Sequence, residues 1–185
     1  MVYDLWLKNV DTDTSMRAED FASNVPEGYR LVEPRAAAEE KLLTVGSTAP
    51  DFKLPRPDSS FVQLEDVLKR QKVVLLNFWF CDCAPCRSEL PLLEKLHRKL
   101  RGRGLEIIAV NTVDSAARIR KCVKDDGLSF EIVVGGTEDA KAVKAYKVES
   151  CPTNILIGAR RRVLWRGVGF DEAALRQALA AAGFE

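Results

Sequence analysis

The sequence has little of the chemistry that marks several common classes of protein. Its 185 residues include one histidine, two methionines and a formal net charge of only +1. A nearly neutral protein has no built-in electrostatic preference for nucleic acid or for a membrane surface. No apolar run follows Met1, so neither a signal peptide nor a transmembrane anchor is expected in this chain.

The cysteines are few and unevenly spaced. Their number, five, is odd, and they do not form the dense, even framework of a small domain held together by disulfides. Redox chemistry explains them better than structural bridging. The composition, 46% hydrophobic and 30% charged, describes one globular domain with some additional chain.

The most informative stretch is an apolar run followed closely by two cysteines. Residues 73–80 are apolar, β-branched or aromatic apart from one asparagine, which predicts a strand buried on both faces. Cys83 and Cys86 follow at once. Pro85 stands where a first helical turn tolerates proline, and residues 87–100 carry apolar side chains at helical spacing. The two cysteines are therefore expected at a strand-to-helix corner.

At such a corner, the free N–H groups and the dipole of the helix favour a thiolate over a thiol. We expect a lowered pKa for Cys83 at the exposed helix start, and deeper burial for Cys86. This arrangement suits thiol–disulfide exchange, because one thiolate attacks a partner's disulfide and a second thiol resolves the mixed disulfide. Half of a zinc site is the alternative. However, no second Cys-x-x-Cys follows, and the only histidine, His97, is expected on a basic helix away from Cys86.

The rest of the chain alternates between predicted strands and predicted helices. Strands are expected at residues 105–111 and 130–134, and hairpins join 52–54 to 61–64 and 154–157 to 163–166. Helices are expected at residues 64–69, 116–124 and 138–146, followed by a last helix that Asp171 caps and that runs to Ala182. This alternation predicts an α/β domain whose mixed sheet is covered by helices on both faces.

Three segments resemble one known family in the right order. Residues 78–91, with the Cys-x-x-Cys pair, are similar to the active-site segment of the thioredoxin superfamily, and most similar to its TlpA/ResA-type thiol–disulfide oxidoreductases. Residues 45–54 resemble the opening of that branch, and residues 148–157 resemble its cis-proline strand. The resemblance implies a thioredoxin-like fold with a central mixed sheet, helices on both faces and an N-terminal β-hairpin.

The resemblance also implies roles for individual residues. Cys83 attacks and Cys86 resolves, while Pro152 is in the cis form and aligns an extended partner segment. Asn77 stands where thioredoxins proper carry a buried acid, and Glu89 replaces that acid in this branch. Glu89 lies three residues after Cys86 on the same helical face, so it is expected to move protons during exchange. The alternative for Glu89 is a solvated surface residue.

Four further residues are expected on the substrate-binding side: Trp79, Asp82, Pro85 and Cys151. Asp82 departs from the family, which usually has Trp or another large residue just before the first cysteine. Its negative charge disfavours a thiolate on Cys83, and the sequence leaves open whether Arg87 offsets it. For Cys151 three interpretations stay open, namely a small buried residue, a third redox thiol that pairs with Cys83 or Cys81, and a metal ligand.

Two other functions compete with the oxidoreductase. The opening segment is shared with peroxiredoxins, but a peroxiredoxin nucleophile normally has Thr or Ser three residues earlier and Pro seven residues earlier. Here Cys83 has Phe80 and Leu76 at those places, which makes peroxidase activity unexpected. The second rival is a redox-inert or metal-carrying binding module that uses Cys83, Cys86 and Cys151. The preferred interpretation needs no cofactor and no metal.

The domain organisation completes the prediction. Residues 1–43 are expected to be an N-terminal extension, or the tail of an upstream domain, and residues 44–185 a thioredoxin-like domain. The expected partners are protein dithiols and disulfides, with no nucleic acid, and the protein is expected to be a monomer. Because the family usually works outside the cytoplasm, we expect an extracytoplasmic location in bacteria. The missing leader then indicates that the chain is a fragment of a longer protein.

Overall fold

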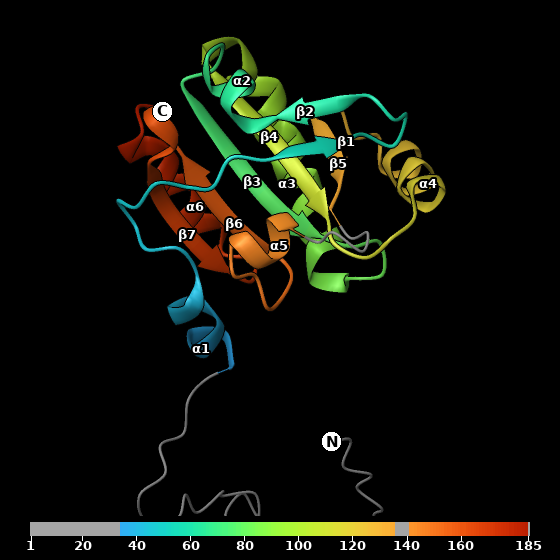
Figure 1. The fold of residues 1–185 in the computed structure, drawn as a ribbon, viewed down its shortest axis with the longest axis horizontal. Helices are drawn as coiled ribbons and strands as arrows, with labels where there is room; N and C mark the ends of the chain where they lie inside the picture. Colours follow the sequence, from blue (N-terminus) through green and yellow to red (C-terminus); the bar gives the residue numbers. More distant parts are fainter. Residues whose placement is uncertain (1–33, 136–140, 185) are drawn as a thin grey trace, which may run out of the picture. The chain divides into compact units, whose positions relative to one another are not determined.

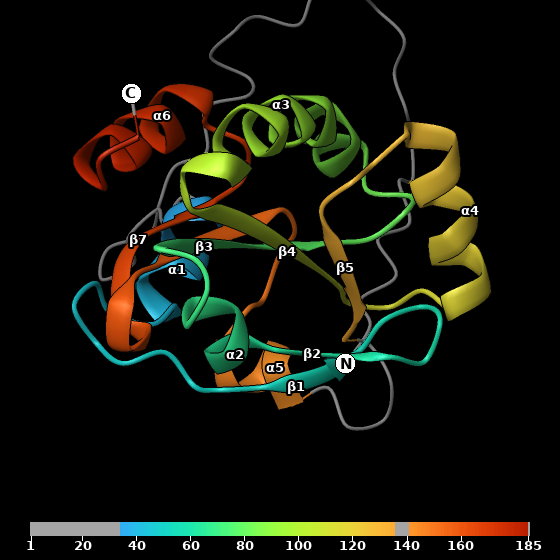
Figure 2. The same cartoon turned by 90° about the horizontal axis from the view of Figure 1, so that it is seen from above.

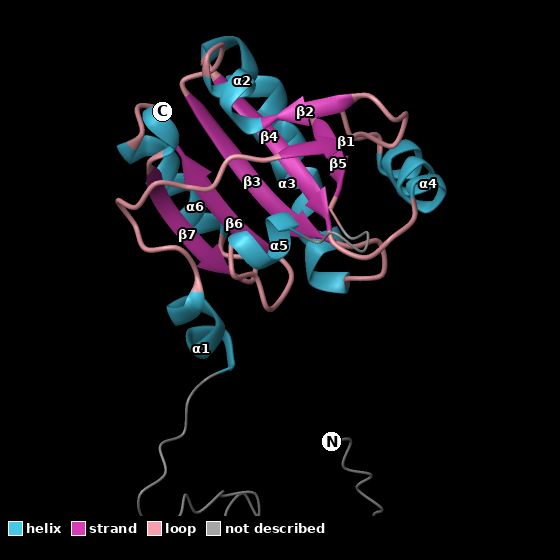
Figure 3. Ribbon diagram, in the orientation of Figure 1, coloured by secondary structure: helices cyan, strands magenta, loops and turns pink. Residues whose placement is uncertain are grey.

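A five-stranded mixed sheet forms the centre of the computed structural model, which describes residues 34–135 and 141–184. Its strands, in spatial order, are β5 (Glu131–Val134), β4 (Leu105–Asn111), β3 (Val73–Trp79), β6 (Thr153–Ile157) and β7 (Val163–Val168). β3 pairs in parallel with β4 and antiparallel with β6 (Figure 3). The expected buried central strand is confirmed as β3, because all seven of its residues are buried.

Side chains of β3 alternate between the two faces of the sheet, as the pleat requires. Val73, Leu75 and Trp79 enter one apolar cluster. Leu76 and Phe78 enter the other. An odd-numbered residue of β3 therefore points toward the first cluster, and an even-numbered residue toward the second.

Helices cover both faces of this sheet (Figures 1 and 2). On the first face lie α3 (Ala84–Leu100) and α6 (Glu172–Ala181), and on the opposite face lie α2 (Leu64–Leu68), α5 (Lys141–Ala145) and the hairpin of β1 (Lys53–Pro55) with β2 (Phe61–Gln63). α4 (Ala116–Asp126) lies outside β5 at the sheet edge. The α/β fold class, the mixed sheet and the N-terminal hairpin are all confirmed.

Polar residues mark the helix starts as the sequence indicates. The Asp171 side chain accepts a hydrogen bond from the backbone N–H of Ala174 and caps α6, and Ser115 caps α4 in the same way. Gly127 ends α4 in the left-handed conformation, with φ at 62°, which a residue with a Cβ rarely adopts. Two 3-10 turns, η2 (Arg101–Arg103) and η3 (Ala159–Arg161), complete the elements.

A short helix before the domain, α1, spans Pro34–Lys41. Its Ala38, together with Leu42, packs against Val168 of β7. The expected extension before residue 34 lies outside the described residues, so the domain division at residue 43 stays a prediction. The first residues of the helix predicted from 138 also lie outside them.

Within residues 34–135 and 141–184, no helix combines the length and the apolar character that crossing a membrane requires.

Candidate active site

The two cysteines of the Cys-x-x-Cys pair lie at the start of α3 and form a disulfide whose Cα atoms are 5.2 Å apart. Cys83 is the N-cap residue, and its Sγ accepts a hydrogen bond from the backbone N–H of Cys86 at 3.2 Å. Pro85 occupies the first turn, where a helical N–H has no partner within the helix, so its missing donor costs nothing. The predicted strand-to-helix corner is therefore confirmed.

The prediction of an exposed Cys83 is wrong for this disulfide form. Cys83 is only 4% exposed and Cys86 1% exposed, and both belong to the apolar cluster between the sheet and α3. In this disulfide the Cys83 sulfur is bonded to the sulfur of the buried Cys86. The exposed residues of this turn are Asp82, Ala84 and Pro85.

Trp79 does not lie on the substrate-binding surface that the sequence analysis assigned to it. It is the last residue of β3, its side chain is fully buried, and it packs in the cluster beneath α3. Its odd position on β3 explains this placement, because the pleat turns it toward the helix layer. Trp79 therefore packs beneath the active-site turn and is not placed to contact a substrate directly.

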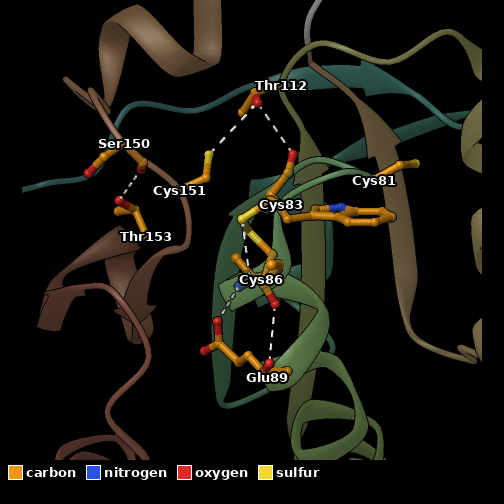
Figure 4. Close-up of a disulfide and its surroundings, with 12 residues drawn as sticks. Cys81, Cys83, Cys86, Glu89, Thr112, Ser150, Cys151 and Thr153 are labelled. Atoms are coloured by element: carbon orange, nitrogen blue, oxygen red, sulfur yellow. Dashed lines mark hydrogen bonds between the residues drawn. A yellow bond between two sulfur atoms is a disulfide. The ribbon is translucent and has the colours of Figure 1, made fainter. Parts of the chain in front are cut away.

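Glu89 is buried beside the disulfide, which overturns the alternative of a solvated surface residue. It is 1% exposed, and its two carboxylate oxygens accept hydrogen bonds from two amides. Asn154 Nδ2 donates to Oε1 at 2.5 Å, and Asn77 Nδ2 donates to Oε2 at 3.4 Å. Figure 4 shows the Glu89 side chain next to Cys86, on the side of the disulfide opposite Thr112.

Strand geometry explains why these three polar residues meet. Asn77 is an odd-numbered residue of β3 and so faces α3, where Glu89 lies one turn after Cys86. The antiparallel register pairs Asn77 directly with Asn154 of β6, and Asn77 Nδ2 also donates to Asn154 Oδ1 at 3.0 Å. Sequence reasoning missed Asn154. The available signal was the amide of Asn154 directly before the apolar residues 155–157 of β6.

Burial raises the pKa of Glu89 from its ordinary value of 4.5 to about 7, although the hydrogen bonds from Asn154 and Asn77 oppose this shift. The reason is that a carboxylate loses its hydration when it is buried, while no cation among the described residues pairs with it. A carboxyl group of this kind is half protonated near neutral pH. It is therefore suited to take up and return protons.

Across the disulfide from α3 lies the segment that leads into β6. The Cys151–Pro152 peptide bond is cis, and Pro152 is buried. The Cys151 Sγ lies 3.8 Å from the Thr112 hydroxyl, and that hydroxyl also donates to the carbonyl of Trp79 at 3.3 Å (Figure 4). Thr112, which sequence reasoning missed, therefore links the proline segment to the turn before Cys83.

Cys151 is half-buried, and burial raises the pKa of its thiol, although the hydrogen bond with Thr112 works in the opposite direction. A thiol with a raised pKa is mostly protonated at neutral pH and is a poor nucleophile. This favours the interpretation of Cys151 as a small residue that shapes the site over that of a third redox thiol.

The carboxylate of Asp82 is paired with Arg118, not with Arg87. Its side chain is 74% exposed and lies 2.5 Å from a guanidinium nitrogen of Arg118 in α4. Arg87 instead pairs with Asp126 at 2.6 Å. The negative charge that the sequence places beside Cys83 thus has a cation next to it, so its effect on the thiolate is smaller than Asp82 alone would produce.

His97 is buried in the core far along α3, with its two ring nitrogens 2.8 Å from Glu106 and 3.3 Å from the Ser129 hydroxyl. The part of the chain that the structure describes holds no group of three or more His, Cys, Asp or Glu side chains placed to bind a metal ion. Neither finding supports the alternatives of a zinc site or a metal-carrying module.

The fold and this site together define a thiol–disulfide oxidoreductase with a thioredoxin-like fold. Residues 45–166 match the AhpC/TSA family, and the chain belongs to that family. Among proteins of known function it is similar to the thiol-disulfide oxidoreductase ResA of Bacillus subtilis, with 31% identity over 137 residues, which cover 74% of each chain. It is also 36% identical to ResA of Geobacillus thermodenitrificans over 125 residues, which cover 68% of this chain and 70% of that protein.

Solved structures agree with this assignment. A structure described as the thiol:disulfide interchange protein DsbE of Chlorobium tepidum shares 31% identity and superimposes with a TM-score of 0.68. That comparison covers 76% of this chain and 98% of the other. The thioredoxin domain of a thiol-disulfide oxidoreductase from Bacteroides vulgatus shares 25% identity, with a TM-score of 0.67 over 75% of this chain and 97% of the other.

Proposed function

We propose that Cys83 is the attacking thiol of this oxidoreductase and that Cys86 resolves the mixed disulfide. The observation that carries this assignment is the hydrogen bond from the Cys86 N–H to the Cys83 Sγ at the start of α3. In the reduced protein this donor and the helix dipole stabilise negative charge on the Cys83 sulfur. Cys86 lies deeper, so a partner reaches Cys83 first.

The exchange proceeds through two displacement steps. The Cys83 thiolate attacks one sulfur of a partner disulfide, and the other partner sulfur leaves as a thiolate that takes up a proton. Cys86 then loses its proton and attacks the Cys83 sulfur, which forms the Cys83–Cys86 disulfide and releases the second partner thiolate. Two electrons pass to the partner, and the reverse sequence oxidises a partner dithiol.

Glu89 is the group that takes the proton from Cys86 in this scheme. It lies one helical turn away, and its pKa of about 7 lies between the ordinary carboxyl and thiol values. Because the Glu89 carboxylate accepts a proton at neutral pH, it can remove the proton from the Cys86 thiol as that thiol attacks. The two amides that hold its oxygens, Asn77 and Asn154, position the group.

The partner binds over the exposed turn and the proline segment. Pro85 and Asp82 are exposed in the turn that carries the disulfide, while Cys151, the residue before Pro152, lies on the opposite side of it (Figure 4). An extended segment of the partner adds to the backbone before β6 in the manner of an additional strand. The substrate class is therefore protein dithiols and disulfides, in agreement with the names of the relatives.

The resemblance to TlpA/ResA-type proteins supports an extracytoplasmic location for this protein, with residues 1–43 as an extension before the redox domain. We expect the domain itself to act as a monomer. Cell fractionation of the natural gene product and light scattering of the purified domain test these two statements.

Trapping of partners tests the assignment of the cysteines. Cys86→Ser leaves Cys83 able to attack but removes the thiol that resolves the intermediate, so mixed disulfides with partner proteins should accumulate. Cys83→Ser is the matched control and should trap none. If Cys83→Ser accumulated the complexes and Cys86→Ser did not, the two roles would be reversed.

A further inference from the structure

Two cysteines that the exchange reaction does not use lie against each other beside the active site. Cys81, Cys122 and Cys151 are free thiols in this structure. The side chain of Cys81 interacts with the thiol of Cys122, and both belong to the apolar cluster beneath α3. Cys81 lies in the turn between β3 and α3, and Cys122 lies in α4.

A polar network holds these two segments together independently of the thiols. The backbone N–H of Cys81 donates to Asp114 Oδ2 at 2.7 Å, and Arg118 of α4 pairs with Asp114 at 3.0 Å. Arg118 also pairs with Asp82, the residue after Cys81. Cys122 follows Arg118 by four residues, so it lies one turn further on the same face of α4. The contact between the two thiols is therefore a consequence of how α4 is fixed on the turn.

The two thiols differ in accessibility. Cys81 is 4% exposed, whereas Cys122 is half-buried and reachable from solvent. Burial, followed by contacts with Cys122 and Asp114, raises the pKa of the Cys81 thiol. Cys81 is thus a poor first nucleophile, and a reagent meets Cys122 first. Figure 4 shows the Cys81 sulfur pointing away from the Cys83–Cys86 bond, so the pair is separate from the active-site disulfide.

We infer that Cys81 and Cys122 are a second dithiol, which small disulfides such as glutathione disulfide convert to an intramolecular disulfide. The Cys122 thiolate attacks one sulfur of glutathione disulfide, forms a mixed disulfide and releases one glutathione. The Cys81 sulfur then attacks Cys122 Sγ and releases the second glutathione, whose departing thiolate takes up the Cys81 proton. Two protein thiols are oxidised, and one glutathione disulfide is reduced to two glutathiones.

The new bond would tie α4 covalently to the turn that leads to Cys83, two residues after Cys81. In this structure the same connection is non-covalent: the Cys81 N–H donates to Asp114, and the half-exposed Arg118 pairs with Asp114 and with the exposed Asp82. Oxidation of the second dithiol therefore restrains the substrate-facing turn.

Thiol counting in the full wild-type chain tests this inference. With Cys83–Cys86 already oxidised, the protein has three free thiols. Treatment with glutathione disulfide should reduce the count to one, without a lasting glutathione adduct, and mass mapping should find the peptides of Cys81 and Cys122 linked. Cys151→Ala should lose two thiols in the same way, whereas Cys122→Ser should keep both of its remaining thiols.

Three outcomes would overturn the inference. These are a count that stays at three, a glutathione adduct that persists on Cys122, and a linkage of either cysteine to Cys151. Near-UV circular dichroism of each variant before treatment confirms that the native packing is retained. Because the wild-type chain alone decides between the outcomes, failure of a variant to fold leaves the test intact.

Discussion

Replacement of Glu89 by Gln should make the folded protein more stable at alkaline pH, and the structure sets the size of the effect. The carboxyl is 1% exposed, and its pKa rises from 4.5 in an unfolded chain to about 7 in the folded one. This shift of about 2.5 units corresponds to roughly 3 kcal/mol, at about 1.4 kcal/mol for each unit. Glutamine has nearly the same shape but does not ionise.

The sign follows from proton binding. Between pH 4.5 and about 7 the folded protein keeps the Glu89 proton, whereas the unfolded chain has lost it. Stability due to this group is therefore fully present below pH 4.5 and falls as pH rises toward and through 7. Relative to the wild type, Glu89→Gln should gain roughly 3 kcal/mol of unfolding free energy between pH 4 and pH 8.

The hydrogen bonds of the site favour this replacement. Asn154 Nδ2 can donate to the amide oxygen of glutamine as it does to Glu89 Oε1. Only the long contact from Asn77 Nδ2 to Oε2, at 3.4 Å, loses its acceptor, because the glutamine Nε2 is a donor, while Asn77 Nδ2 keeps its hydrogen bond to Asn154 Oδ1. The variant therefore loses little hydrogen bonding, and the pH-dependent part of the difference reports on ionisation.

Urea unfolding of both oxidised proteins at several pH values measures the effect. Glu94→Gln is a matched control on the same helix. Burial pushes the pKa of Glu94 upward, but hydrogen bonds from Ser129 and Arg98 lower it overall. The contribution of Glu94 to the unfolding free energy therefore changes only below pH 4.5. The difference in unfolding free energy between Glu94→Gln and the wild type should then be constant from pH 5 to 8. A constant difference for Glu89→Gln over pH 4 to 8 would refute our account of the buried carboxyl.

Three further predictions follow from the same site. Asn154→Ala removes a hydrogen bond that lowers the pKa of Glu89, so the pH midpoint of the exchange rate should shift upward. The free energy of unfolding should fall by about 1–3 kcal/mol. An unchanged midpoint would show that Glu89 does not take part in the reaction. Arg118→Gln leaves two carboxylates without their cation, so alkylation of reduced Cys83 should slow by roughly two- to fivefold, whereas Lys121→Gln on the same helix should not change it. Cys151→Val should retain reductase activity within about twofold and shift the reduction potential or partner preference, because the raised pKa keeps this thiol protonated; complete loss with the fold intact would make Cys151 a required thiol.

Local patterns in the sequence determined the secondary structure and the position of the redox pair. A run of apolar residues long enough for one strand can be buried only in the middle of a sheet, and β3 lies there. Cys83 and Pro85 have the properties of a helix start, and Asp171 those of an N-cap, since capping depends on a few adjacent residues. Such features depend on neighbours in sequence and are visible without coordinates.

Only the tertiary structure decided which distant residues share the site. The burial of Glu89 depends on the register between β3 and β6, which places Asn77 opposite Asn154. Contact between Cys81 and Cys122 depends on how α4 packs beside the active-site turn. Strand register and helix packing result from apolar burial summed over the whole core, and no short segment carries that information. The exposure of a side chain, its pKa and its hydrogen-bond partner therefore depend on the assembled core and not on the local sequence.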